Sequence, residues 1–109
     1  MNLNRQIPPP ICPLSDIHVT YPESQRLKNG IPLHVIRAGM EDVVRFDLLI
    51  GAGQWNQTQA LQAMFTNRML REGTSSLTSQ QIAEKLDYYG AWLELSSSLN
   101  CGFITLYSL

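Results

Sequence analysis

The stretch Gln59–Thr74 reads QALQAMFTNRMLREGT, and it separates three predicted strands from a second helix and two further strands. Apolar side chains recur in it at helical spacing, namely Leu61, Met64, Phe65 and Met69. Asn56 or Thr58 can accept hydrogen bonds from the free amides of a first turn, and Gly73 suits a C-terminal stop. The pattern therefore predicts an amphipathic helix from about Thr58 to Glu72 with one apolar stripe.

The segment that follows predicts a second helix and two strands. Thr78 suits the N-cap, and Gln81, three residues later, can complete a capping box. Gly90 ends this helix, whose predicted core-facing residues are Ile82, Leu86 and Tyr89. Apolar and polar residues then alternate over 91–97 and again over 101–109, with a turn at 98–100. Alternation with a period of two is typical of strands.

The segment before the stretch predicts strands as well. Residues 25–37 favour a β-hairpin in which Asn29-Gly30 supplies the positive φ angles of a type I′ turn. Residues 43–50, VVRFDLLI, form a strand that Gly51-Ala52-Gly53 ends. Alternation over 17–21 indicates a short edge strand before Pro22.

The resulting order, β-β-β-α-α-β-β, predicts an α+β fold in which an antiparallel sheet of about five strands carries both helices on one face. Five of the six prolines precede position 23, so residues 1–22 are predicted to be a Pro-rich arm and residues 23–109 the domain. The chain stops inside the apolar pattern of its last strand. From that pattern we expect either that the domain is truncated or that its last strand pairs with another copy.

The composition narrows the classes of function. The chain has 109 residues, enough for one small domain, a formal net charge of -1 and no run of Lys or Arg, so nucleic acid is an unfavoured partner. No apolar run approaches the ~18–20 residues that cross a bilayer, and no signal peptide is visible. A cytoplasmic location is predicted, while a periplasmic or organellar one stays open. Cys12 and Cys101 are expected to be free thiols.

Several short segments in 26–109 resemble the N-terminal domain of the pitrilysin/insulinase family of zinc metallopeptidases, which includes the mitochondrial processing peptidase subunits. The similar segments occur in the family's order: LKNGI at 27–31, GAG at 51–53, LREGT at 70–74, IAEKL at 82–86 and YGA at 89–91. Their shared order and spacing carry the resemblance.

The family's catalytic motif, H-x-x-E-H, is degenerate in this sequence. Two His one helical turn apart hold Zn²⁺, and the Glu acts as general base. By register from Gly73-Thr74, the three positions are Met64, Asn67 and Arg68. A thioether, an amide and a fixed cation replace both ligands and the base. The third ligand of the family would lie beyond residue 109. The resemblance therefore implies no zinc cofactor for this chain, although active members use zinc.

Two interpretations of these positions remain. Arg68 beside Asn67 could hold a carboxylate. The favoured alternative is that Met64 belongs to the core, Arg68 extends to solvent and Asn67 is solvated.

Substrate peptides in this family add as a strand to the sheet edge that follows the second helix. The resemblance aligns Glu94, Leu95 and Ser96 with that peptide-pairing stretch. Strand addition uses backbone groups and does not need the metal ligands. An ordinary internal strand is the competing interpretation.

The predicted function is that of a non-catalytic subunit or half, which supports peptide binding and proteolysis by an active partner. Its expected partners are an active peptidase subunit or further copies of the chain, together with extended peptides. The alternative is a purely structural or protein-interaction domain with no peptide role.

Overall fold

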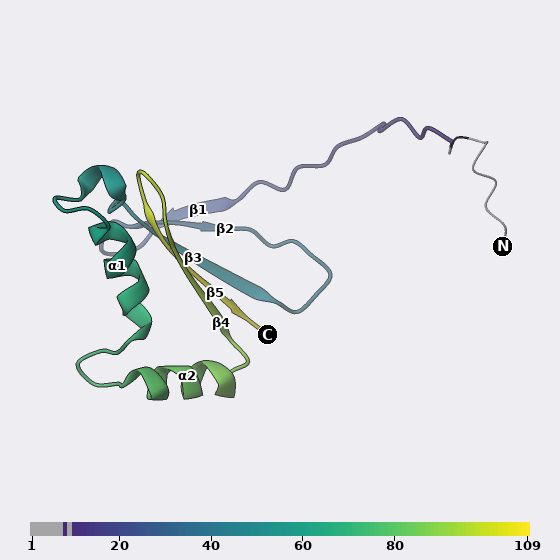
Figure 1. Cartoon of the computed structure of the whole chain (residues 1–109). Coiled ribbons are helices and arrows are strands. Elements are labelled where there is room, and N and C mark those ends of the chain that lie inside the picture. Colours follow the sequence, from purple (N-terminus) through teal and green to yellow (C-terminus); the bar gives the residue numbers. More distant parts are fainter. Residues whose placement is uncertain (1–7, 9) are drawn as a thin grey trace. The chain divides into compact units, whose positions relative to one another are not determined.

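The computed structural model describes residues 8 and 10–109, and its division into two compact units falls between Met40 and Glu41. Residues 1–7 and 9, which belong to the predicted arm, lie outside the described residues. The first unit contains an antiparallel hairpin of β1 (Glu23–Arg26) and β2 (Pro32–Val35) (Figure 1). The strand predicted at 17–21 is wrong, because those residues form no strand and, within the described part of the chain, β1 pairs with β2 alone.

The turn of this hairpin differs from the predicted type I′. A type I′ turn needs positive φ at both central residues, and only Gly30 has one, at +85°. The Gly30 N–H donates to the Leu27 carbonyl at 2.9 Å, and the Leu27 N–H donates to the Ile31 carbonyl at 2.9 Å. Asn29 contributes through its side-chain oxygen instead, which accepts from the Ile31 N–H at 3.2 Å.

The second unit, residues Glu41–Leu109, contains a three-stranded antiparallel sheet in the order β3-β5-β4. Its strands are β3 (Val44–Ile50), β4 (Trp92–Ser97) and β5 (Gly102–Ser108). The α+β class and the five strands are confirmed, but the strands lie in two sheets and not in one. The strand β2 has only four residues and begins with Pro32, which lacks the N–H that a second ladder requires.

The first helix is shorter than predicted. α1 spans Gln62–Arg68, a 3-10 turn (η2) follows at Met69–Arg71, and another (η1) covers Gln54–Asn56. The helix begins after Leu61, whose φ of +68° is left-handed, so the helix cannot continue toward the N-terminus.

Neither predicted cap fulfils that role. The Asn56 side chain donates to the Gly51 carbonyl at 2.6 Å. The Thr58 hydroxyl and backbone N–H both bond the Gln62 side-chain oxygen, at 3.1 and 3.0 Å. The Gln62 side chain, from within the helix, thus accepts from the N–H groups of Thr58 and Gln59, which precede the first turn.

The second helix is the one that local sequence predicted best. α2 spans Ser79–Tyr88 with Thr78 as N-cap. The Gln81 N–H donates to the Thr78 hydroxyl at 3.3 Å, and the Thr78 N–H donates to the Gln81 side-chain oxygen at 3.0 Å. This reciprocal pair is the predicted capping box. Gly90, with φ of +57°, ends the helical run.

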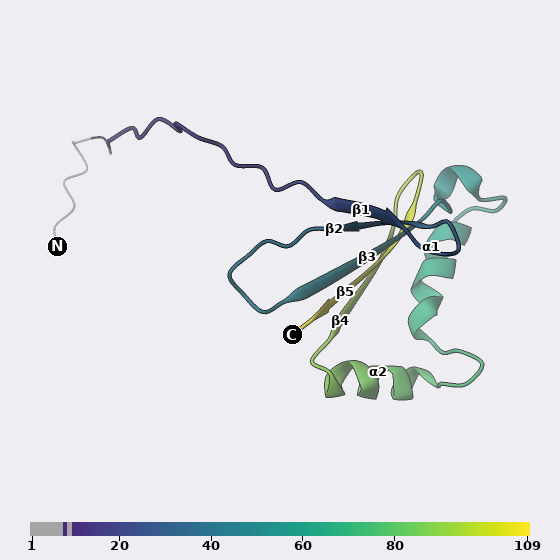
Figure 2. The ribbon, with the colours of Figure 1, turned by 180° about the vertical axis from the view of Figure 1, so that it is seen from behind.

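Both helices lie on one face of the three-stranded sheet, as predicted (Figure 2). α1 contacts β4 and β5, and Ile82 and Leu86 of α2 line a pocket together with Leu106 of β5. Tyr89, which was predicted to face the core, is exposed and packs edge-to-face on Tyr88 at 5.0 Å.

Apolar burial is shallow in this unit. No apolar side chain among the described residues is fully buried, and the two buried polar ones are Asn67 and Thr105. The predicted apolar stripe of α1 is mostly exposed, since Phe65 and Met69 face solvent and only Met64 is half-buried. No helix within the described residues combines the length and the apolarity that crossing a membrane requires.

Candidate functional site

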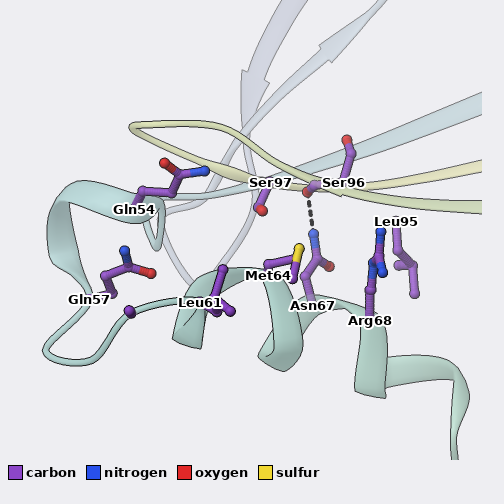
Figure 3. A pocket seen from close by; sticks show the side chains of 10 residues that line it. Gln54, Gln57, Leu61, Met64, Asn67, Arg68, Leu95, Ser96 and Ser97 are labelled. Carbon is purple, nitrogen blue, oxygen red and sulfur yellow. Dashed lines mark hydrogen bonds between the residues drawn. The ribbon is translucent and has the colours of Figure 1, made fainter.

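A cavity of about 430 Å³ lies between α1 and the edge strand β4 (Figure 3). It brings together the three positions of the degenerate motif and two of the three predicted peptide-contact residues. The residues that line it are Gln54, Gln57, Ala60, Leu61, Met64, Asn67, Arg68, Leu95, Ser96 and Ser97. Segments separated by some thirty residues of sequence thus meet at one place.

Asn67 is the structural centre of the site. Its side chain is 7% exposed, so the expectation of a solvated Asn67 is wrong. The Nδ2 group donates to the Ser96 carbonyl and, at 3.3 Å, to the Phe103 carbonyl. Ser96 and Phe103 are directly opposite each other on β4 and β5. A single amide therefore ties α1 to both strands at the same rung of the ladder.

This contact also defines which backbone groups of β4 are free. One amide can reach both carbonyls only if both point into the space between the two strands. Residues 96 and 103 are therefore a hydrogen-bonded pair of the ladder. The Ser98 N–H, two residues on, likewise donates to the Cys101 carbonyl at 2.8 Å. Because orientation alternates along a strand, the N–H and C=O groups of Leu93, Leu95 and Ser97 point away from β5. They form the open edge of the sheet.

Two arginines flank this edge. The Arg71 Nη2 donates to the Leu93 carbonyl at 3.1 Å, so one outward acceptor is already bonded. Arg68 extends toward the strand beside Leu95 (Figure 3). Within the described part of the chain the one ion pair joins Arg45 to Asp47, and Arg68 is the only charged residue that lines the cavity. The cavity is therefore cationic.

Glu94, the third predicted contact residue, lies on the opposite face of the sheet. There it shares a shallow depression with Arg45, Asp47 and Thr105. The Thr105 hydroxyl donates to Asp47 Oδ1 at 2.7 Å, and this bond, together with bonds from Arg45, lowers the pKa of Asp47. The hydrogen bond between Arg45 and Asp47 also raises the pKa of Arg45. The Arg45 guanidinium carbon lies 5.4 Å from the centroid of the Tyr107 ring.

Sequence reasoning missed the outward groups of Leu93 and Ser97, and it missed the two glutamines of the cavity wall. The strand alternation was a usable signal for the former. Nothing in the local pattern marks Gln54 and Gln57, because the turn that positions them depends on distant backbone bonds. The N–H groups of Gln54 and Trp55 donate to the Ser98 and Leu99 carbonyls at 3.0 and 2.9 Å.

The residues at the motif positions do not fit a zinc ion. Met64 offers a thioether, and the Asn67 amide already donates to two strand carbonyls. Arg68 adds a fixed positive charge where the second imidazole would stand. No group of three His, Cys, Asp or Glu residues comes together in residues 8 and 10–109.

The sequence matches no protein-family model, and no curated protein matches it at a significant level. The resemblance to the pitrilysin/insulinase family therefore stays a prediction from the sequence motifs.

Proposed function

We propose that residues 41–109 form a non-catalytic peptide-binding domain, which takes an extended peptide as an added strand on β4 and supports proteolysis by an active partner. The observation that carries this proposal is the open edge of β4. The outward groups of Leu95 and Ser97 lie beside the cavity of α1 and have no protein partner among the hydrogen bonds of the described residues. Main-chain pairing at such an edge supplies affinity, and pockets for alternate side chains supply specificity.

The cavity indicates what kind of peptide would fit. In an added antiparallel strand, the residue opposite Leu95 directs its side chain to the same face as Leu95. That face carries α1, so the side chain would enter the cavity next to Arg68 and Met64. A guanidinium without an ion-pair partner favours a carboxylate, which it can bind through two parallel hydrogen bonds. An extended peptide with Asp or Glu at that position is therefore the expected ligand.

The same residues argue against hydrolysis by this chain. A metallopeptidase needs two ligands and a general base at the positions that Met64, Asn67 and Arg68 occupy. The Asn67 carboxamide is not basic enough to accept a proton near neutral pH, and it bonds the helix to the sheet. The chain's part in proteolysis would be to present a peptide.

Titration calorimetry with two extended peptides, which differ by Glu or Gln at the central position, tests the proposal. Leu95→Pro removes one outward N–H and no bond to β5, so proline is tolerated at this edge. Leu95→Ala is the matched control, because it shortens the side chain and keeps the N–H. We expect the proline variant to lose binding and the alanine variant to retain it. Arg68→Gln should abolish the preference for the Glu peptide.

Equal binding by the proline variant would show that the peptide does not pair with β4. Stoichiometric zinc on the purified chain, lost on substitution of Asn67 or Arg68, would contradict the non-catalytic assignment. Chelator-sensitive peptidase activity of the chain alone would contradict it as well.

A further inference from the structure

The strand β3 forms the other edge of the three-stranded sheet. The alternation fixed by the β4–β5 pair turns the even-numbered residues of β5 toward β3, where Ile104 and Leu106 pair with Leu48 and Phe46. The backbone groups of Arg45, Asp47 and Leu49 consequently point outward. Apolar side chains follow this edge on both faces, with Val44 66%, Phe46 51% and Leu49 58% exposed. A long exposed apolar edge strand is a template for pairing with another strand.

The two charged residues of β3, Arg45 and Asp47, precede and follow Phe46 in the strand and share one face of the sheet. Arg45 Nε and Asp47 Oδ2 are 2.9 Å apart. The strand β5 holds both in place, because Thr105 donates to Asp47 and the Tyr107 ring lies under Arg45. The edge thus presents an ordered positive group and an ordered negative group two residues apart.

We propose that this edge pairs with β3 of a second copy, antiparallel, with the two-fold axis at Phe46. In this register Arg45 of each copy lies opposite Asp47 of the other, and their outward backbone groups form reciprocal hydrogen bonds. The four charges alternate in sign around a rectangle, and the two Phe46 side chains meet on the helix-bearing face. Pairing joins the two three-stranded sheets into one.

Charge selects this register over its neighbours. An axis at Arg45 or at Asp47 places like charges directly opposite each other, which is destabilising. A shift by an odd number of residues sets outward backbone groups against inward ones. Self-pairing of β4 about Leu95 would set Glu94 against Ser96 with no charge complement, and Arg71 already bonds the Leu93 carbonyl. The inference concerns β3 and does not rest on the peptide function of β4.

Charge reversal gives a test with internal controls, measured by analytical ultracentrifugation of the full chain. Arg45→Asp gives two acidic positions and Asp47→Arg gives two basic ones, so each variant alone should weaken the dimer by at least about tenfold in Kd. The double variant, with both charges exchanged, restores complementarity and should dimerise again. An equimolar mixture of the two single variants should form a heterodimer. A circular dichroism spectrum unchanged from the parent shows that each variant is folded.

Cysteine crosslinking tests the register independently. Residues in a non-hydrogen-bonded antiparallel pair have Cα atoms about 4.5 Å apart, which is within the range of a disulfide. With Cys12 and Cys101 replaced by alanine, Phe46→Cys should form a disulfide-linked dimer under mild oxidation. Leu48→Cys, displaced from the axis, should not. A monomeric parent chain at high concentration, or equal crosslinking at both positions, would overturn the proposal.

Discussion

Replacement of Asn67 tests the contact that fixes α1 on the sheet. The carboxamide donates to the Ser96 and Phe103 carbonyls and is 7% exposed. A buried hydrogen bond contributes roughly 0.5–1.5 kcal/mol net, so two lost bonds suggest a range of about 1–3 kcal/mol for Asn67→Ala. Because the pairing of Ser96 with Phe103 leaves both carbonyls a partner across the ladder, no acceptor is orphaned. We therefore expect a loss of about 1–2 kcal/mol in the free energy of unfolding.

Asn67→Asp sharpens the test, because a carboxylate would face two carbonyl oxygens in a buried position. Repulsion and desolvation should raise the pKa of the new carboxyl group in the folded state. When the pKa of a group is higher in the folded than in the unfolded state, the protein keeps its full stability below the unfolded-state pKa. The protein loses stability as the pH rises through the folded-state pKa. The variant should resemble Asn67→Ala near pH 4 and be at least about 3 kcal/mol less stable than the parent at pH 7.

Urea unfolding of the parent and both variants, followed by circular dichroism at pH 4 and pH 7, measures these differences. The comparison with the parent at each pH removes the contributions of other titrating groups. A parent and an alanine variant whose free energies of unfolding agree within about 0.3 kcal/mol would refute the assigned role, because even one hydrogen bond contributes about 0.5 kcal/mol or more. An aspartate variant with the same deficit at both pH values would refute the electrostatic reasoning.

Two further substitutions probe the sheet and its loops. A Cβ on Gly53 would collide with the backbone of residues 99–101. Gly53→Ala should therefore lower the free energy of unfolding by about 2 kcal/mol or more, as overpacking does, in thermal or urea unfolding. Gly51→Ala is the matched control, because a Cβ there meets nothing within 4 Å. Thr105→Val removes the main cause of the lowered pKa of Asp47, so an NMR titration should show that pKa rising toward 3.8. A carboxyl group whose pKa is lowered in the folded state stabilises the fold above its unfolded-state pKa. The loss of stability in this variant should therefore be present at pH 7 and shrink as the pH falls below about 4. An Asp47 pKa that the substitution leaves unchanged would contradict the hydrogen bond.

The sequence predicted those elements that local chemistry determines. The capping box of Thr78 and Gln81 lies within four residues, and the helix it starts was predicted with its correct beginning. The alternation over 91–97 predicted a strand, and β4 spans Trp92–Ser97 with alternating exposure. Periods and caps of this kind need no information from distant parts of the chain.

The first helix shows where such reasoning stops. Its apolar stripe predicted that Met64, Phe65 and Met69 would be buried together, yet only Met64 of these three is partly buried. The buried residue of the helix is the polar Asn67. The two strand carbonyls that Asn67 bonds are 29 and 36 residues away. No helical period encodes a bond over that separation, so the polar residue was placed in solvent.

The same limit applies to the site. The predicted motif positions Met64, Asn67 and Arg68 lie on one helix, and of the predicted peptide-contact residues Glu94, Leu95 and Ser96 the last two line the same cavity. Which backbone groups of β4 are free depends on the parity of its pairing with β5. The Ser96–Phe103 and Ser98–Cys101 pairs reveal that parity, whereas the sequence indicates strand periods without register.

The two proposed partners occupy opposite edges of one sheet, and this has an energetic consequence. The peptide would pair with β4 and the second copy with β3, while β5 between them keeps both of its ladders. Each partner binds only the folded unit, because the edge it uses exists only when the strands are paired. Each therefore adds RT ln(1 + [L]/Kd) to the free energy of unfolding, which is about 2.7 kcal/mol at a hundredfold excess over Kd. In a unit with no fully buried apolar side chain among its residues, increments of this size are comparable to the Asn67 contact itself, so occupancy of the edges would govern the stability of the fold.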